Sequence, residues 1–469
     1  MQSLPRVPVR LTGAAALRLG WQFARDPIAA MRRTCEDHGP FVAATAFPFI
    51  RRSRMVLLGA PLILTAAAKF NFEVLNNAAV WRSTSLLRGG ARNSAARRLN
   101  DNLTRMAGPR HAHYRRLISR PLRKSNVDAL GERLVWLAND EVASWPVGNT
   151  IDLTQQAHRF LRLLTIELLF GGERRLGYPI ADMAGHLMRR TWSARVMAFP
   201  INLPMTPYAK TLREAEDLER DAIAWVQAKR GHAADDDLVS ILANNPDQDG
   251  AEVDAATIAR GIPALVAMAS EACQTTLVWA LLLLALHPRI ARELLDELSG
   301  APSSIGVSNL PKLDAVVKET MRIVPPVPSQ LRTANCETQL FDYQVPRGAR
   351  LVLSTFVINR SPDLYPEADR FDPARWSTLN PSVFEYPVFG AGPRNCPGYH
   401  FALLVLKVAL ASIVKRYRVE LPAGLRIDYA VHPTLRPVGS IPVVPQRQDG
   451  AFRRASVRGT IRNLIRLDE

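Results

Sequence analysis

The spacing of apolar residues predicts a chain that is helical through its middle and mixed at both ends. Between about residues 110 and 325, apolar positions recur every three or four residues, which is typical of helices that bury one face. The strongest helical segments are 111–122, 127–144, 151–170, 208–229, 238–244, 254–286 and 288–298.

The longest of these segments is also the most apolar. Asp254 is a natural N-cap for it, and Pro263 should kink or break it. From 262 to 286 the only charged residue is Glu271, so the length alone would allow a membrane span. Because polar side chains at 271 and 274–276 would be costly in lipid, we expect a buried central helix instead.

The flanking regions combine short elements with loops. A helical pattern covers 24–39 and should stop at Gly39, a β-like run follows at 54–60, and 82–110 has the composition of a long loop. Beyond residue 326, Pro-rich loops surround strand-like runs at 341–356 and 436–446, and a last strong helix follows Cys396. The tail, 447–469, carries six arginines and little core pattern beyond IRNLIRL.

The composition describes a large globular protein with an excess of positive charge. The chain has 469 residues, 47% of them apolar and 22% charged, which excludes a wholly disordered chain and a small disulfide scaffold. The net charge of +17 indicates attraction to an anionic partner without saying which kind. Four scattered cysteines favour a reducing compartment, and the N-terminus has no apolar run long enough for a signal peptide or anchor.

The most informative segment is FGAGPRNCPGYHFALLVL, which begins at Phe389. Cys396 and Pro397 stand where the last helix should begin, and the positive end of a helix lowers the pKa of a thiol. Arg394 adds a positive charge close by. Three glycines would allow a tight loop and close approach to a flat partner: Gly390, Gly392 and Gly398. The segment therefore predicts a thiolate suited to a soft metal.

Three other interpretations of this segment have to be weighed. An isolated cysteine is most often a buried, inert side chain. The pair Gly390 and Gly392 could belong to a phosphate loop, although no strand-to-helix dinucleotide pattern surrounds it. A zinc site would need more Cys or His nearby than His400.

The segment resembles the haem-binding signature F-x-x-G-x-R-x-C-x-G of the cytochrome P450 family. Phe389, Gly392, Arg394, Cys396 and Gly398 occupy its fixed positions. Two further motifs follow the family order. Glu319 and Arg322 match its E-x-x-R, and Arg375 matches a later segment whose arginine joins that pair in a buried network. The resemblance covers roughly residues 25–446.

The resemblance implies roles for further residues. Cys396 would ligate the iron of haem b, with Phe389 beside the thiolate. His111, Arg115, Arg332 and Arg394 would hold the two haem propionates. Without the family match, the basic stretch that begins at Arg110 would be interpreted as a solvated helix face. The substrate pocket would be lined by residues around 78–105, 264–273, 324–330 and 432–435.

One departure from the family pattern lies in the long helix. The family usually has A/G-G-x-E/D-T there, an acid–alcohol pair that delivers protons to dioxygen. With the register set by Trp279 and Pro288, the acid is Glu271 but the alcohol is replaced by Ala272. A slip onto Thr275 or Thr276 would require an insertion in the helix. Either the substrate or water supplies the missing hydroxyl, the chemistry is not ordinary hydroxylation, or the change is neutral.

The resemblance predicts a mainly α fold with a small β portion, the cytochrome P450 fold, over 1–446, followed by the basic tail 447–469. It implies a monooxygenase that takes dioxygen, a small apolar substrate and electrons from a separate ferredoxin or flavodoxin-type donor. We expect a cytoplasmic protein without a transmembrane anchor or a nucleic-acid partner, with contact to a membrane surface left open. The rival hypotheses are coupling, cyclisation or peroxide-driven chemistry, and a haem protein without turnover.

Overall fold

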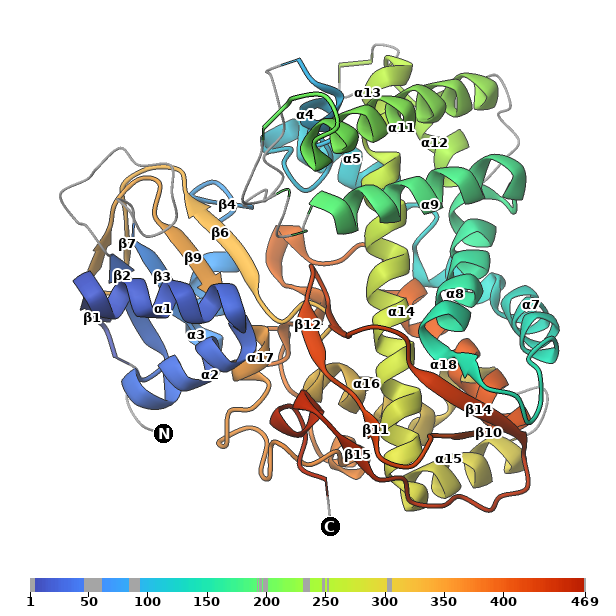
Figure 1. The fold of residues 1–469 in the computed structure, drawn as a ribbon. Coiled ribbons are helices and arrows are strands. Elements are labelled where there is room, and N and C mark those ends of the chain that lie inside the picture. The colour runs from blue at the N-terminus through green and yellow to red at the C-terminus, as the bar shows by residue number, and fades with distance from the viewer. Residues whose placement is uncertain are drawn as a thin grey trace.

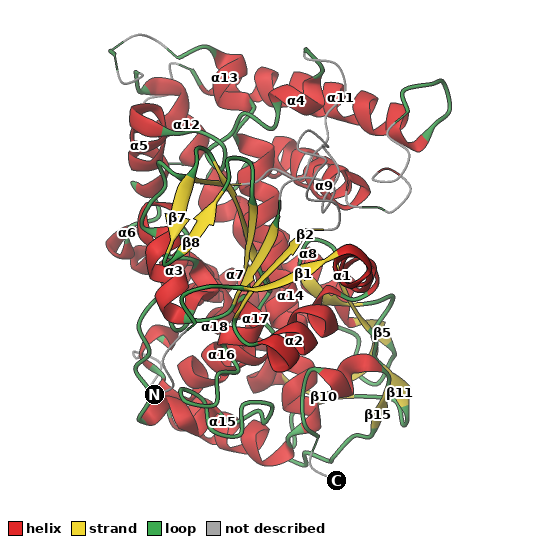
Figure 2. Ribbon diagram, turned by 90° about the vertical axis from the view of Figure 1, so that its left-hand side faces the viewer, coloured by secondary structure: helices red, strands yellow, loops and turns green. Residues whose placement is uncertain are grey.

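The computed structural model describes residues 5–45, 61–83, 93–191, 193, 196, 201–230, 237–246, 249–250, 253–301 and 306–467. A helical body surrounds one long central helix, and a sheet with its own helices lies against one side of it (Figures 1 and 2). The predicted mainly α fold with a small β portion is confirmed. The β-like run predicted at 54–60 lies outside the described residues.

Most of the long helices of the body correspond to predicted segments. The helices of the body are α4 (Ala95–Arg98), α5 (Gly108–Ser119), α6 (Lys124–Ala129), α7 (Gly131–Ala143), α8 (Leu153–Phe170), α9 (Arg174–Thr191), α11 (Pro207–Lys229), α12 (Leu238–Asn244), α13 (Ala255–Ala259), α14 (Ile262–Leu286), α15 (Pro288–Gly300), α16 (Pro311–Ile323) and α18 (Tyr399–Arg416). Of these, α4, α9 and α16 lie outside the predicted segments.

Three details differ from the sequence-based expectation. The segment predicted as one helix at 127–144 is divided between α6 and α7, and the predicted loop at 82–110 contains α4 and the start of α5. Helix α9 was not among the predicted segments, because Pro179 and two glycines inside it weaken the helical signal. It packs across α14 in the upper part of Figure 1.

The central helix forms as expected. The predicted break near Pro263 is confirmed, since α13 ends at Ala259 and α14 begins at Ile262 with the proline in its first turn. By length and composition alone, the stretch Ala255–Leu286 could cross a membrane, and it is the only such stretch among the described residues. Within its most apolar window, 72% is buried inside the protein, as in the core helix of a globular protein.

The main sheet has six strands in the order β1–β2–β3–β9–β6–β4. Their bounds are β1 (Val9–Thr12), β2 (Phe41–Thr45), β3 (Leu62–Thr65), β9 (Arg350–Leu353), β6 (Gln330–Ala334) and β4 (Trp81–Ser83). The flanking helices are α1 (Gly13–Arg25), α2 (Pro27–His38), α3 (Ala68–Leu75) and α17 (Thr355–Ile358). Helix α2 ends at Gly39 with φ +80°, which confirms the predicted stop.

Smaller strand pairs complete the fold. They are β7 (Thr338–Leu340) with β8 (Tyr343–Val345), β10 (Tyr417–Glu420) with β14 (Pro442–Arg447) and β5 (Ile151–Asp152), β11 (Leu425–Arg426) with β15 (Val457–Arg458), and β12 (Tyr429–Val431) with β13 (Leu435–Pro437). The tail is folded against this part of the chain. Ile461, Leu464 and Ile465 are buried in the core, so the short IRNLIRL pattern marks real packing.

A buried ion network fixes α16 to the segment that leads to Cys396. Glu319 and Arg322 are fully buried and joined by two hydrogen bonds of 2.8 and 2.9 Å. Arg375 donates to the same carboxylate at 3.0 Å, and Trp376 Nε1 donates at 2.9 Å. The predicted network of Glu319, Arg322 and Arg375 is therefore confirmed.

We predict that Glu319→Ala lowers the stability of the protein by about 3–5 kcal/mol, because it leaves buried guanidinium groups without their carboxylate. Glu36→Ala is the matched control. It removes one carboxylate from an exposed pair with Arg32 in α2, which should cost less than about 1 kcal/mol. Denaturant midpoints compare the two variants with the wild type. Equal midpoints for both variants would contradict a structural role for the network.

Candidate functional site

A tight loop presents Cys396 at the start of α18. Gly390 and Gly392 have φ values of +68° and +65°, which glycine adopts without strain. A side chain at Gly392 would also collide with α3, because its Cβ would lie 2.4 Å from the carbonyl oxygen of Leu75. The backbone N–H of Cys396 donates to the carbonyl of Phe389 at 2.7 Å, which closes the loop.

The surroundings of the thiol correct one expectation. Helix α18 begins at Tyr399, so Pro397 is not its first residue. The N–H of Gly398 donates to the sulfur and the charge of Arg115 favours the thiolate, but burial outweighs both and raises the pKa of the Cys396 thiol. The sequence-based prediction of a lowered pKa is thus wrong for the free thiol. Metal binding would reverse this, since a coordinating thiol is deprotonated outright.

Four cationic or imidazole side chains converge near Cys396. His111 and Arg115 lie one turn apart on α5, Arg332 comes from β6, and Arg394 comes from the cysteine loop. Arg115 donates to the backbone and side chain of Asn395, next to the cysteine. Arg394 donates to the carbonyls of residues 103 and 104 at 3.1 Å and to that of residue 106. Three separate parts of the chain therefore meet here.

The charges of this cluster repel one another. Burial and the charge of Arg394 lower the pKa of Arg332 to about 10. Burial and the charges of Arg394 and Arg115 lower the pKa of His111 to about 4, so His111 is neutral at pH 7. Within the described part of the chain, none of the four side chains has an acidic partner. The cluster therefore fits an anionic group that the described residues do not supply.

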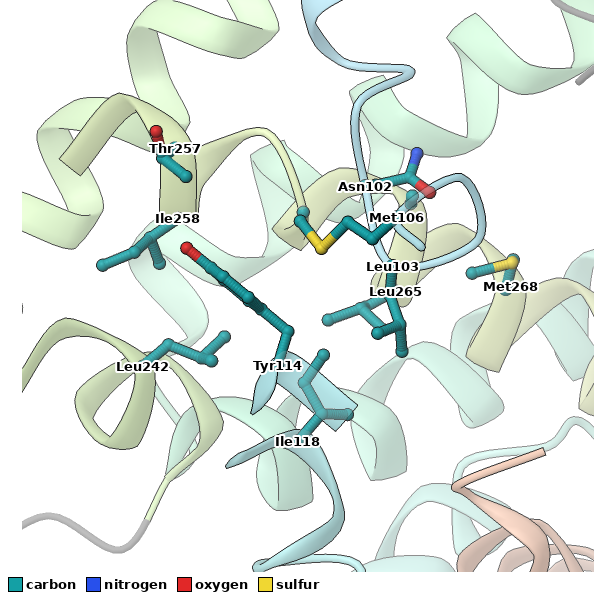
Figure 3. Close-up of a pocket in the computed structure, with 12 residues that line it drawn as sticks. Asn102, Leu103, Met106, Tyr114, Ile118, Leu242, Thr257, Ile258, Leu265 and Met268 are labelled. Carbon is teal, nitrogen blue, oxygen red and sulfur yellow. The ribbon is translucent and has the colours of Figure 1, made fainter. Parts of the chain in front are cut away.

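One face of α14 is not fully covered by the surrounding side chains. Ala264, Leu265, Met268, Ala269 and Ala272 are not fully buried, although most of the rest of the helix is. The upper end of this face lines a small pocket that is partly open to solvent. Figure 3 shows side chains from the loop at 102–106, from α5 and from α12 around the same space. The lining is mostly apolar, as in sites that bind small organic molecules.

The predicted catalytic pair lies beside this face. Ala272 carries no hydroxyl, while the nearby threonine hydroxyls are engaged: Thr275 with Thr434 at 3.2 Å, and Thr276 with the carbonyl of Ala272 at 2.9 Å. Helix α14 runs without interruption through this region, and the register that places Ala272 at the family threonine stays a prediction.

The side chain of Glu271 lies between two arginines. Arg189 Nη1 lies 3.6 Å from its Oε2, and Arg436 Nη1 lies 3.6 Å from its Oε1. The sequence does not predict that these two arginines approach Glu271, since neither belongs to a motif and they lie about 250 residues apart.

The zinc interpretation and the other three cysteines find less support as the origin of a metal site. Among the described residues no three His, Cys, Asp or Glu side chains come together as metal ligands. Cys273 is fully enclosed, and burial raises the pKa of its thiol to about 12. Burial also raises the pKa of the Cys35 thiol to about 12, and Cys336 lies on the surface.

The residues present fit haem. Cys396 offers a thiolate to iron, the cation cluster offers donors to two carboxylates, and the exposed face of α14 offers an apolar surface. The ring of Phe389 packs edge-on against Tyr399, with centroids 4.7 Å apart. Its carbonyl accepts from Cys396, so the aromatic residue is a direct neighbour of the ligand loop.

Comparisons with known proteins agree with this fit. A family model described as cytochrome P450 matches residues 54–434. Over most of their length the described residues superpose on solved structures that share the fold. Retinoic acid-bound cyanobacterial CYP120A1 has a TM-score of 0.79 and 22% identity, with 95% of this chain and 100% of that one covered. CYP175A1 from Thermus thermophilus has a TM-score of 0.74 and 22% identity, covering 94% and 100%.

Curated relatives match in part. The 3-beta-hydroxylase of Tanacetum parthenium is 34% identical over 34% of this chain and 34% of its own length. The beta-amyrin 6-beta-monooxygenase of Solanum lycopersicum is 27% identical over 52% and 54%. The chain thus spans about a third to a half of the length of these relatives. The cyclooctat-9-en-7-ol 5-monooxygenase of Streptomyces melanosporofaciens is 27% identical over 71% and 76%.

We predict that Arg332→Gln releases haem several times faster than the wild type, because it removes a buried charge from the anion-binding cluster. Arg347→Gln, on an exposed turn between β8 and β9, is the matched control and should not change the rate. The measurement is the rate of haem transfer to excess apomyoglobin. Equal rates in all three proteins would show that Arg332 does not contact the bound group.

Proposed function

Because the chain belongs to the cytochrome P450 family, we propose that it is a haem-thiolate monooxygenase that oxidises a small, largely apolar molecule. The observation that carries the proposal is the position of Cys396, on a closed loop beside a cation cluster that has no acidic partner among the described residues. The cofactor we propose is haem b. Its two carboxylates would meet His111, Arg115, Arg332 and Arg394.

Haem held by a thiolate, when bound, activates dioxygen for the insertion of an oxygen atom into a C–H bond. The chain's own residues would do the rest. Cys396 would ligate the iron, and the four cationic or imidazole groups would hold the two carboxylates of the cofactor. The apolar face of α14 excludes water from the reacting side. Glu271, next to Ala272, is the carboxylate on this helix that can hold or move a proton there.

Two observations support an organic substrate of modest size. The pocket beside α14 is lined mainly by Leu, Ile, Met and Ala side chains. The relatives from Solanum lycopersicum and Streptomyces melanosporofaciens are named for the oxidation of beta-amyrin and of cyclooctat-9-en-7-ol, both small organic molecules. Electrons would come from a separate ferredoxin or flavodoxin-type protein, and we propose a cytoplasmic location.

The thiolate assignment has a direct test. We predict that Cys396→Ser abolishes the reduced carbon-monoxide band expected of a thiolate haem, because a hydroxyl is a poor substitute for a thiolate ligand. Cys35→Ser is the matched control and should leave the band intact. An unchanged band in the Cys396 variant would refute the axial-ligand assignment and with it the proposed function.

Chemistry other than hydroxylation is the second candidate, and the observation that favours it is the missing hydroxyl at Ala272. If the normal chemistry bypasses proton delivery, Ala272→Thr should leave product formation nearly unchanged. If instead the substrate or water supplies the missing hydroxyl, we predict that the variant raises the product formed per NAD(P)H consumed on surrogate substrates, because it restores a hydroxyl that can hold water or dioxygen. With the native substrate the same variant should lose activity through crowding. Identical coupling in wild type and variant, with both kinds of substrate, would show that position 272 does not face the oxygen site.

Reduction by the donor protein should depend on salt. The net charge is +17, and α5 places exposed Arg116 beside Arg115, which contacts the cysteine loop. We predict that the rate of reduction by an acidic ferredoxin falls steeply as ionic strength rises above about 0.1 M, where charges are screened beyond about 10 Å.

Charge reversal locates the docking face. Arg116→Glu should slow reduction by the same donor several-fold at low salt. Arg289→Glu, which changes an exposed side chain of α15, should not. A reduction rate that is independent of salt and of Arg116 would indicate apolar docking instead.

A further inference from the structure

The two arginines beside Glu271 are only loosely engaged by it. Both contacts measure 3.6 Å, which is longer than a hydrogen bond, so each guanidinium has donors to spare. The side chains of Arg189 and Arg436 are 30% and 34% exposed, whereas that of Glu271 is 8% exposed. Within the described part of the chain, Glu271 is the only acidic partner of either arginine. Two positive charges thus share one negative charge.

The chain holds this group at the border of the apolar face of α14. Strand β13 is fixed to α14 by a hydrogen bond from Trp279 Nε1 to the carbonyl of Leu435 at 2.8 Å. The same strand is fixed at Pro326, whose carbonyl accepts from the N–H of Leu435 at 3.0 Å. Arg436, the next residue, then reaches Glu271 from this anchored strand.

Arg189 approaches Glu271 from the other side. Helix α9 packs against α14, which it crosses in Figure 1, and β13 also contacts α14. Met268 lies one turn before Glu271 on α14 and is 43% exposed, and Ala272 directly follows Glu271. The arginine pair therefore stands next to the surface on which the substrate would rest, and the apolar pocket continues from the same face.

The neighbouring arginine shows what a satisfied pair looks like here. Arg190, the next residue of α9, pairs with Glu214 of α11 at 2.8 Å. It has one carboxylate of its own at hydrogen-bond distance, whereas Arg189 and Arg436 share a carboxylate at longer range. Of these two neighbouring arginines of α9, only Arg189 therefore belongs to a group with surplus positive charge.

We propose that Arg189 and Arg436 form a binding site for a carboxylate on the substrate. This inference rests on the proposed function and names its substrate class: a molecule with an apolar body and one carboxylate. The apolar part lies along Met268 and Ala272, and the carboxylate completes the hydrogen bonds of the two guanidinium groups. A ligand charge of −1 brings the group of two arginines and Glu271 to neutrality.

The test uses holoenzyme and probes that anchor themselves to the iron. A series of ω-(imidazol-1-yl)alkanoic acids is compared with the corresponding methyl esters, and binding is followed by the red shift of the Soret band. For the best chain length, the acid should bind the wild type about tenfold more tightly than its ester, because charge-assisted hydrogen bonds are lost in the ester.

Three variants assign the effect to residues. Arg189→Gln and Arg436→Gln should each reduce the preference for the acid to about twofold or less, with the affinity for the ester nearly unchanged. Arg190→Gln is the matched control and should keep the tenfold preference.

Equal affinity of acids and esters in the wild type would overturn the inference, and so would an acid preference that survives in both variants. If Cys396→Ser behaves as predicted but no probe shifts the Soret band, the pocket does not open on the iron. The inference then fails while the proposed function stands. If Cys396→Ser keeps its carbon-monoxide band, the proposed function fails first.

Discussion

The structure depends on a cluster of like charges that the described residues do not neutralise. His111, Arg115, Arg332 and Arg394 come from α5, β6 and the cysteine loop, and burial together with the neighbouring arginine charges lowers the pKa values of His111 and Arg332. Bringing several cations together without a counter-ion destabilises the folded state, and an anion bound between them removes this cost. Haem carries two carboxylates and an iron that takes a thiolate, so we propose that one cofactor satisfies both the cluster and Cys396. The arrangement of the site follows from that requirement.

The remainder of the fold holds these groups in place. Helix α14 supplies a straight apolar wall, and the buried network around Glu319 fixes α16 to residues 372–376, upstream of the cysteine loop. Gly392 allows the loop to pass within contact distance of α3. Positions far apart in the sequence are thereby fixed by local contacts of a few kinds: one buried carboxylate, one glycine turn and one long helix.

The sequence predicted the parts of the molecule that follow from local pattern or from a motif. The break before α14 follows from Pro263, the end of α2 from Gly39, and the ion network from the family motif, and all three are confirmed. The prediction that the pKa of Cys396 is lowered is wrong for the free thiol. Burial of the sulfur depends on tertiary packing, and it outweighs the effects of the Gly398 N–H and of Arg115. Helix α9 was missed because Pro179 lies inside it, and the partners of Glu271 were missed because long-range contacts leave no periodic signal.

We propose that the cation cluster binds the two carboxylates of haem while Cys396 binds its iron. Reconstitution of the apoprotein with haem and with haem dimethyl ester tests it most directly, since the two cofactors differ only in those carboxylates. We expect the wild type to lose the dimethyl ester to apomyoglobin at least tenfold faster than haem, and we expect this difference to shrink in Arg332→Gln. Equal rates of loss for the two cofactors from the wild type would contradict it.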